Sequence, residues 1–443
     1  MGAHLVRMAR PIEAPTDQVS AIAQARRRMV ETGQWRGGQL MGRRWPIGCV
    51  ALEITQRCNL DCTACYLSES SEAVRDLPLQ EVFRRIDMIF DHYGSNTDVQ
   101  ITGGDPTLRR RADLVSIVRQ VRAKSMRPTL FTNGIRAKRD LLEELAAAGL
   151  VDVAFHVDLT QQRRGFSSEK QLNTLRQEYI ERVRGLNLPV MFNTTVFDGN
   201  IEQIPDLVAF FVRNSDMVRL ASFQLQADTG RGSHSRRQGN IDFAELQRQI
   251  ELGAKANLNF DVIRVGHARC NRSAVTIVAN GKVYDMLGDT QLVHEVVEAT
   301  AELSFDRQHP STVVRACVGA LLTRPALALR CAAWLARQAW RAKWDLLCSR
   351  GHVHKLSFFA HDFMDACKLE QERVDACVFS VATAEGPVCM CLHNARRDAF
   401  ILQPVQVPHP DGDRYWNPLS GAITASPEPT PGVAFRPISR RRS

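Results

Sequence analysis

Apolar positions between residues 48 and 257 switch repeatedly from the two-residue period of a strand to the helical period of 3.6 residues. The segments expected as strands are Cys49–Thr55, Asp98–Thr102, Pro128–Thr132, Val151–Leu159, Pro189–Phe197 and Val218–Gln226. Helical stretches separate them, among them Leu79–Tyr93, Arg139–Ala148 and Asp242–Asn257. The alternation predicts six right-handed βαβ units around a parallel sheet, which is an α/β fold.

The pattern changes on both sides of this series. Residues 1–45 are basic, and Gln18–Thr32 can form one amphipathic helix packed on the main domain. After residue 260, Asn280-Gly281 between two β-rich runs predicts a hairpin. The predicted organisation is a basic N-terminal extension (1–45), a strand–helix barrel (46–260), a further region (261–400) with a helical insert (313–349), and a tail (401–443) that is flexible from about residue 426.

The helical insert mixes Leu and Trp with Arg and Lys. Such a mixture can lie at a membrane surface or hold a lipid tail. The simpler alternative is an ordinary helical lid packed on the barrel. The sequence predicts that one of these two arrangements holds for residues 313–349.

Composition narrows the class of protein. The 12 cysteines are not preceded by the apolar N-terminal run of a secretory signal, so a reducing, cytoplasmic location is expected, where clustered cysteines bind metal or take part in catalysis. The net charge of +9 favours an anionic partner such as a lipid head group or a phosphorylated substrate. Peripheral contact with a membrane is consistent with this charge. The excess of arginine is scattered along the chain, which weakens any inference from the net charge, and no nucleic-acid partner is expected.

Three cysteines follow the first strand within eight residues: Cys58, Cys62 and Cys65. Three thiolates at this spacing can hold three irons of a cubic 4Fe–4S cluster and leave the fourth iron without a protein ligand. An open iron can chelate an amino group together with a carboxylate. A zinc knot or buried thiols are the alternatives, but structural zinc is bound by four closed ligands and a fourth is missing nearby.

Further motifs follow the next strands. Gly103-Gly104-Asp105-Pro106-Thr107 comes after the second strand and Thr132-Asn133-Gly134 after the third, so both are expected at the same end of the barrel as the cysteines. Paired glycines let backbone approach a ligand without a Cβ between them. His156 and Asp158 end the fourth strand, and strand alternation puts them on one face. Polar side chains of strands five and six are possible substrate contacts or buried polar groups: Asn193, Thr195, Gln224 and Gln226.

Together these motifs resemble the radical S-adenosylmethionine (radical SAM) superfamily. The resemblance implies a partial (β/α)6 barrel related to the TIM barrel, with SAM bound through the open iron of the 4Fe–4S cluster held by Cys58, Cys62 and Cys65. It places the SAM ammonium group at the carbonyls of Gly103 and Gly104, where the family's GGEP segment appears here with Asp105 before Pro106. Further expected cofactor contacts are Thr132, Asn133 and, at the ribose, Asp158. The family often has an aromatic residue before the third cysteine, where this chain has Ala64.

Five more cysteines are candidates for a second site: Cys270, Cys367, Cys377, Cys389 and Cys391. The surrounding FMD, RV and Cys391-Leu392-His393-Asn394 segments, with Gly266-His267 upstream, resemble the superfamily branch that contains the archaeal pterin methylase and the tetraether lipid synthase. This resemblance implies an auxiliary 4Fe–4S cluster on Cys270, Cys377 and Cys391, with Cys367 as the expected fourth ligand and Cys389 left open. A structural zinc ion is the alternative, since thiolates suit both metals.

The resemblance also implies an activity. Enzymes of this superfamily cleave SAM reductively to a 5′-deoxyadenosyl radical, which abstracts hydrogen from an unactivated carbon, so no catalytic residue beyond the cluster is required. The expected outcome is carbon–carbon bond formation or alkyl or methyl transfer on a lipid-like or heterocyclic small-molecule substrate, in a transferase or lyase reaction. The expected partner is a reductase such as flavodoxin or ferredoxin.

Two other functions remain open at this point. A peptide-modifying radical SAM maturase would need a docking module for a leader peptide, and residues 1–45 are expected to be too short for one. A zinc-dependent regulatory or nucleic-acid-binding protein would be colourless and contain zinc in place of iron.

Overall fold

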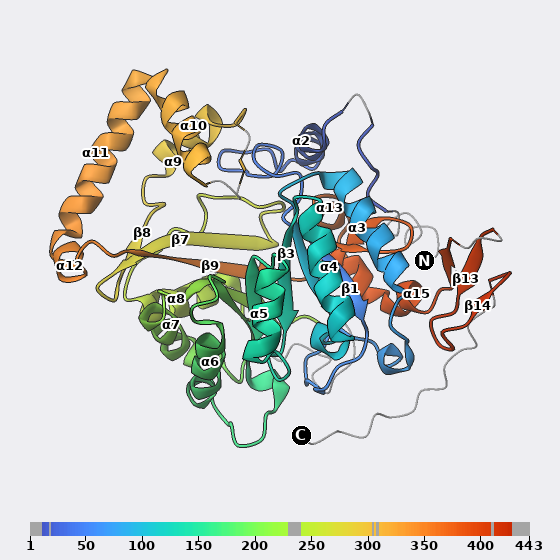
Figure 1. Cartoon of the computed structure of the whole chain (residues 1–443). Coiled ribbons are helices and arrows are strands. Elements are labelled where there is room, and N and C mark those ends of the chain that lie inside the picture. Colours follow the sequence, from blue (N-terminus) through green and yellow to red (C-terminus); the bar gives the residue numbers. More distant parts are fainter. Residues whose placement is uncertain are drawn as a thin grey trace.

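The computed structural model describes residues 11–16, 19–228, 241–303, 305–306, 310–408 and 412–427 (Figure 1). Its core is a run of parallel strands in the order of the chain: β1 (Cys49–Thr55), β2 (Asp98–Gly103), β3 (Arg127–Thr132), β4 (Asp152–His156), β5 (Val190–Val196) and β6 (Val218–Leu225). The helices that connect them are α3 (Leu79–Tyr93), α4 (Arg111–Ala123), α5 (Arg139–Ala147), α6 (Glu169–Val183) and α7 (Ile204–Arg213), and α8 (Phe243–Ala254) follows β6. The predicted partial (β/α)6 barrel is confirmed.

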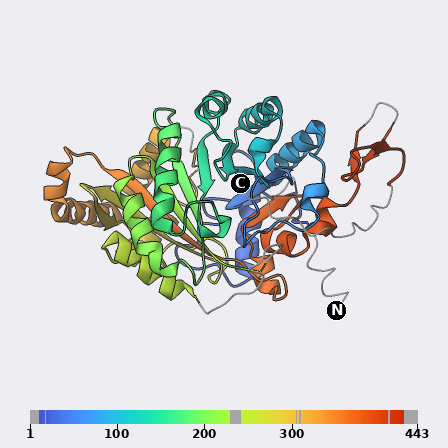
Figure 2. The same ribbon diagram turned by 90° about the horizontal axis from the view of Figure 1, so that it is seen from below.

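The helices cover the outer face of the strands (Figures 1 and 2). Strand β1 is buried at all its positions because helices and the barrel interior cover its two faces. Helix α3 turns Val82, Ile86 and Ile89 onto the sheet, and each of these side chains is fully buried. The sequence forms the barrel because its strands turn apolar residues toward helices that are apolar on one face, and several of the strands turn polar residues into the interior.

Two more parallel strands widen the barrel. Strand β10 (Phe379–Ala382) pairs in parallel with β1, and β9 (His354–Asp362) pairs in parallel with β6. Antiparallel strands extend the two edges to an 11-stranded sheet: β11 (Pro387–Cys389) beside β10, and β7 (Asn271–Ala279) with β8 (Lys282–Asp285) beyond β9. The predicted hairpin is β7–β8, whereas β9, β10 and β11 were not predicted.

Aromatic side chains meet across the gap between β9 and β10. The ring of Phe379 on β10 lies 6.3 Å from that of Phe359 and 5.2 Å from that of His361, centroid to centroid, and both partners belong to β9. Backbone hydrogen bonds order the sheet from β11 to β8 and leave these two strands unpaired with each other. Side-chain packing therefore closes the side of the barrel that backbone pairing leaves open.

The N-terminal extension packs on the C-terminal region. Helix α2 (Ala21–Glu31), capped by Ser20, buries Met29 in a small core with Met41, Ala376 and Val378. Short 3-10 helices lie at Ser71–Ala73, Pro106–Leu108, Leu159–Gln161 and Ile201–Gln203. The C-terminal helices are α13 (Gln371–Asp375), α14 (Met390–Ala395) and α15 (Arg397–Ile401).

Part of the predicted tail is ordered. Strands β12 (Val405–Val407), β13 (Arg414–Trp416) and β14 (Ile423–Thr424) form a small separate sheet. The segment expected to be flexible from about residue 426 falls mostly outside the described residues, which end at residue 427.

Four helices follow the β7–β8 hairpin at the outer end of the molecule: α9 (Thr290–Ala299), α10 (Pro310–Leu322), α11 (Pro325–Arg341) and α12 (Lys343–Cys348) (Figures 1 and 2). Within the part of the chain that the structure describes, every helix is too short or too polar to cross a bilayer.

Candidate functional site

A cavity of about 210 Å³ opens at the carboxyl ends of the barrel strands. Cys58, Cys62 and Cys65 line it together with Gly103 and Gly104. The remaining polar lining comes from most of the strands and from the C-terminal segment: Gln100, Thr102, Thr132, Asn133, His156, Gln161, Asn193, Thr195, Gln224, Gln226 and Asn394. The structure thus brings the predicted cysteine, glycine and Thr132-Asn133 motifs to one place, as expected for the carboxyl ends of parallel strands.

The three thiols influence one another. Burial raises the pKa of the Cys62 thiol, and the neighbouring Cys65 and Cys58 raise it further. Among the described residues no three His, Cys, Asp or Glu side chains are placed to hold a single metal ion. A four-iron cube separates its thiolate ligands more widely than one ion does, and it stabilises thiolates that would otherwise repel each other. Three cysteine thiols that line one cavity are the type of donor set that holds three irons of a 4Fe–4S cluster.

Neighbouring loops hold the cysteine loop in place. The side-chain amide of Asn133 donates to Asn59 Oδ1 over 2.7 Å, and its Nδ2 lies 3.9 Å from Cys58 Sγ. The Thr63 backbone N–H donates to the Thr160 carbonyl over 2.7 Å. Loops that follow β3 and β4 thus fix the loop that follows β1.

The paired glycines also have a structural reason within the chain itself. A Cβ on Gly104 would lie 2.0 Å from the carbonyl oxygen of Arg57, and a Cβ on Gly103, whose φ is +128°, would lie 1.9 Å from that of Thr55. The backbone of these glycines packs against the cysteine loop, and the Tyr66 hydroxyl donates to the Gly103 carbonyl. We predicted glycines that admit a ligand, whereas the close neighbour in the structure is the chain itself.

Asp105 lies behind the cavity wall. Its carboxylate is fully buried and accepts hydrogen bonds from Thr107 N (3.0 Å), Thr132 Oγ1 (2.8 Å) and Asn133 N (2.9 Å). Burial raises the pKa of Asp105, and these hydrogen bonds act in the opposite direction. Asp105 and the buried Pro106 are not among the described lining residues, so Asp105 positions the Thr132-Asn133 loop.

Asp158 also lies outside the cavity lining, and His156 takes the position facing the cavity. The buried carboxylate of Asp158 accepts from Thr160 N (2.9 Å), Thr195 N (2.7 Å) and His156 Nε2 (2.7 Å). Strand β4 ends at His156, and Asp158 caps the following 3-10 helix, so strand alternation does not extend to it. The predicted ribose contact at Asp158 is therefore not supported, because its oxygens are already bonded within the protein.

The His156–Asp158 pair is polarised. Burial alone lowers the pKa of His156, but the facing carboxylate outweighs this effect, and the pKa is raised above its ordinary value. Burial works against ionisation of Asp158 as well, yet the imidazole and the hydrogen bonds lower its pKa to about 2. An imidazole that readily carries a proton thus faces the cavity.

A second group of thiols lies around a small cavity of about 20 Å³ lined by Cys270, Cys377 and Cys391. Arg373 Nε lies 3.2 Å from Cys270 Sγ. A hydrogen bond from the buried Cys389 thiol lowers the pKa of Cys377 to about 7. Thiolates are ligands of iron–sulfur clusters and of zinc, but in the described residues these thiols are not placed to hold a single metal ion.

Cys367 is not part of this group. Neither Cys367 nor Cys389 lines the small cavity, but the side chain of Cys367 is exposed, whereas that of Cys389 is buried. Cys389, which the sequence left open, instead interacts with both Cys377 and Cys391.

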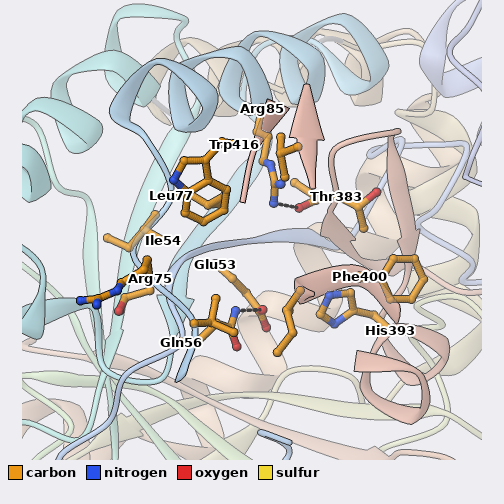
Figure 3. A pocket seen from close by; sticks show the side chains of 15 residues that line it. Glu53, Ile54, Gln56, Arg75, Leu77, Arg85, Thr383, His393, Phe400 and Trp416 are labelled. Atoms are coloured by element: carbon orange, nitrogen blue, oxygen red, sulfur yellow. Dashed lines mark hydrogen bonds between the residues drawn. The ribbon is translucent and has the colours of Figure 1, made fainter. Parts of the chain in front are cut away.

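Sequence reasoning missed a buried ion pair beside the main cavity. The Arg397 guanidinium on α15 donates to both carboxylate oxygens of Glu53 on β1, each over 2.8 Å, and to the Tyr66 carbonyl over 2.9 Å. Figure 3 shows Glu53 hydrogen bonded to Gln56 in a small pocket that His393 also lines. Burial favours the neutral acid, but Arg397 and His393 lower the pKa of Glu53 to about 2.

Comparisons with known proteins agree with this geometry. Residues 52–211 match the model of the family described as Radical SAM superfamily. A probable GTP 3′,8-cyclase of Pyrococcus abyssi is 31% identical over 183 residues, which are 41% of this chain and 58% of the relative. The 7,8-dihydro-6-hydroxymethylpterin dimethyltransferase of Methanocaldococcus jannaschii is 22% identical over 405 residues, 81% of this chain and 78% of the relative.

Other matches are partial. The PqqA peptide cyclase of Methylobacterium nodulans is 27% identical over 51% of this chain and 55% of its own. The solved structure of SuiB from Streptococcus suis bound to S-adenosylmethionine aligns with a TM-score of 0.34 and 18% identity, over 52% of this chain and 47% of that one. The chain thus spans little more than half the length of several relatives. The chain therefore contains a radical SAM domain, as the cysteine spacing predicts.

Proposed function

We propose that this enzyme binds SAM at a 4Fe–4S cluster held by Cys58, Cys62 and Cys65 and uses it to abstract hydrogen from an unactivated carbon of a substrate in the 210 Å³ cavity. The cluster with SAM supplies one-electron cleavage of the sulfonium bond and a 5′-deoxyadenosyl radical. The observation that carries the proposal is that the three thiols, the Gly103-Gly104 backbone and a set of amide side chains share one cavity.

Residues of the chain itself bind SAM and orient it in the cavity. The Gly103 carbonyl accepts from Tyr66 and keeps a second lone pair, which suits the SAM ammonium group. Thr132 and Asn133 line the cavity in the positions that Asp105 fixes. His156 faces the cavity and can hold or release a proton after hydrogen abstraction.

The lining favours a neutral heterocycle over a lipid-like substrate. Amide side chains offer donors and acceptors together, which suits the edges of a polar ring; they are Gln100, Gln161, Asn193, Gln224 and Gln226. The carboxylate of Glu53, which also lines the cavity, is already bonded to Arg397. We therefore infer alkyl or methyl transfer or carbon–carbon bond formation on a heterocycle, in line with the pterin named for the relative that aligns over 81% of this chain.

The alternative substrate is a peptide. The similarity to PqqA peptide cyclase supports a peptide-modifying maturase, but it covers only 51% of this chain. A peptide that occupies the cavity would reach it past the carboxyl ends of the strands.

We also propose an auxiliary 4Fe–4S cluster on Cys270, Cys377, Cys391 and Cys389, with Cys389 in place of Cys367. The guanidinium of Arg373 beside Cys270 offsets part of the negative charge of four thiolates. A reductase such as flavodoxin or ferredoxin is the proposed electron donor.

The test uses protein purified without oxygen. We expect about eight irons per chain for two cubic clusters, and release of 5′-deoxyadenosine when the reduced protein meets SAM. The Cys58→Ala variant should lose this release and keep about four irons, whereas the matched Cys348→Ala variant, whose exposed thiol lies on α12, should behave as the parent protein does.

Persistent SAM cleavage in the Cys58→Ala variant would contradict the assignment. A colourless protein that holds zinc would contradict both cluster proposals. A heterocycle and a peptide are each added together with SAM to distinguish the two substrate classes. The true substrate class should raise the rate of 5′-deoxyadenosine release above the rate without substrate.

A further inference from the structure

Helices α10, α11 and α12, residues 310–348, form an arm that we call the helical arm. It lies beyond the β7–β8 hairpin at the outer end of the molecule (Figures 1 and 2). Of the 13 large apolar side chains that are exposed among the described residues, eight belong to it: Val314, Val318, Leu322, Leu329, Leu335, Trp340, Trp344 and Leu347. An exposed apolar surface of this kind marks an interaction site.

Helix α11 presents its apolar residues to solvent. Leu329, Ala333, Ala336 and Trp340 recur at the spacing of one helical face, and Leu329 and Trp340 are each 71% exposed. Leu327 is the only residue of α11 that is buried. The lid packed on the barrel, one of the two arrangements predicted for this segment, is therefore wrong.

The arm is nonetheless held firmly. Arg330 on α11 forms an ion pair with Glu295 on α9. Asp345 on α12 accepts hydrogen bonds from Asn280 and Tyr284 of the β7–β8 hairpin and an ion pair from Lys282 over 3.1 Å. The exposed apolar face is thus presented on a fixed support.

The arm is also strongly basic. Residues 310–348 contain six Arg and Lys residues and one acid, Asp345, which the hairpin already engages. Arg330, Arg337 and Arg341 follow each other along α11 beside its apolar face. The Lys343 ammonium lies 3.6 Å from the centroid of the Trp340 ring, so a cation and an indole occupy the same end of the helix.

We propose that the helical arm docks the enzyme on the surface of an anionic lipid bilayer. The apolar face of α11, with Trp340 and Trp344, enters the boundary between head groups and acyl chains, and Arg337 and Arg341 pair with lipid phosphates. Tryptophan prefers this boundary because its ring is apolar and its N–H is polar. A second copy of the chain fits less well, because two basic arms would repel each other.

The experiment measures binding of the full-length protein with its clusters to vesicles by flotation. Vesicles of phosphatidylcholine with one quarter phosphatidylglycerol should carry the protein, pure phosphatidylcholine should carry at least tenfold less, and added salt should release it. Trp340→Ser should lower binding about tenfold or more. Leu252→Ser, at an exposed apolar position on α8, is the matched control and should bind as the parent protein does.

Several outcomes would overturn the proposal. One is equal binding to both vesicle types, and another is loss of binding in the Leu252→Ser control that matches the loss in Trp340→Ser. A third is a dimer in analytical ultracentrifugation that Trp340→Ser turns into a monomer, which would make the surface an interface between two copies. SAM cleavage in solution should be unchanged in Trp340→Ser, so failure of this proposal and failure of the proposed activity are separate results.

Discussion

Arg397→Met is the substitution that tests most directly how the C-terminal segment supports the cysteine loop. Arg397 joins Glu53 of β1 to α15 and donates to the carbonyl of Tyr66, the residue after Cys65. Both side chains of the ion pair are buried, with 2% of Arg397 and 6% of Glu53 exposed. Removing the guanidinium leaves a buried carboxylate with only an amide partner, Gln56.

The loss of folding stability in Arg397→Met can be calculated in two ways. The pKa of Glu53 lies at about 2, below its ordinary 4.5, and this difference corresponds to about 3 kcal/mol of stability. Breaking a buried ion pair by removing one partner typically costs about 3–5 kcal/mol. Because the folded pKa is lowered, the stabilisation is present above about pH 4.5 and is lost as the pH falls toward 2.

The stability of Arg397→Met should depend on pH in a different way from that of the parent protein. Without Arg397, burial becomes the dominant influence and raises the pKa of Glu53, so folding of the variant takes up a proton. The deficit relative to the parent protein should therefore grow as the pH rises above about 4.5.

Hydrogen exchange read by mass spectrometry provides the assay. A loss of about 3 kcal/mol should speed exchange in peptides from residues 390–407 roughly a hundredfold, with little change in peptides from α6. The matched control is Arg248→Met, which breaks an exposed pair with Glu245 and should cost less than about 1 kcal/mol. Exchange in residues 390–407 that is no faster than in this control would refute the reasoning.

Three further predictions follow from the site. Gly104→Ala should lose the iron of the N-terminal cluster because its Cβ meets the backbone of the cysteine loop, whereas Gly185→Ala, with open space around it, should keep that iron on a quantitative iron assay. Cys389→Ser should lower the iron content of the auxiliary site and Cys367→Ser should not; the reverse result would restore the ligand set predicted from sequence. The raised pKa of His156 stabilises the fold below about pH 6.5 and loses this effect as the pH rises through the folded pKa, so His156→Gln should lower the melting temperature more at about pH 6 than at about pH 9.

The barrel could be predicted because its signal is local and repeated. Strand β1 and helix α3 have the predicted bounds, since apolar period and flanking turn residues both lie within the segment. Strand β4 is shorter than predicted because Asp158 leaves the strand to cap a 3-10 helix. The cap at Asp158 depends on side-chain hydrogen bonds, which the spacing of apolar residues along the sequence does not reveal.

The features of the site that could not be predicted depend on contacts between residues that are distant in sequence. Spacing along the chain admits either Cys367 or Cys389 beside Cys377, and the antiparallel pairing of Ser380 with Cys389 selects the second. The Glu53–Arg397 pair joins residues separated by 344 positions, and no local pattern marks either partner. A sequence identifies the residues capable of such chemistry, whereas the pairing of strands decides which of them meet.

The auxiliary thiols lie where the barrel needs a closure. Cys270 directly precedes β7, which pairs with β9, while Cys377 precedes β10 and Cys389 ends β11, which pairs with β10. Backbone pairing leaves β9 and β10 apart, and the contacts of Phe379 with rings of β9 bridge them.

A cluster on these thiols would join the two edges covalently, so we expect it to support the barrel whether or not it carries electrons. Cys270→Ser should then speed hydrogen exchange in both β9 and β10, although these strands are far apart in sequence. The matched Cys331→Ser variant, on α11, should leave both strands protected. Faster exchange confined to β9 would contradict a shared closure, because only a centre bound to both edges loosens them together.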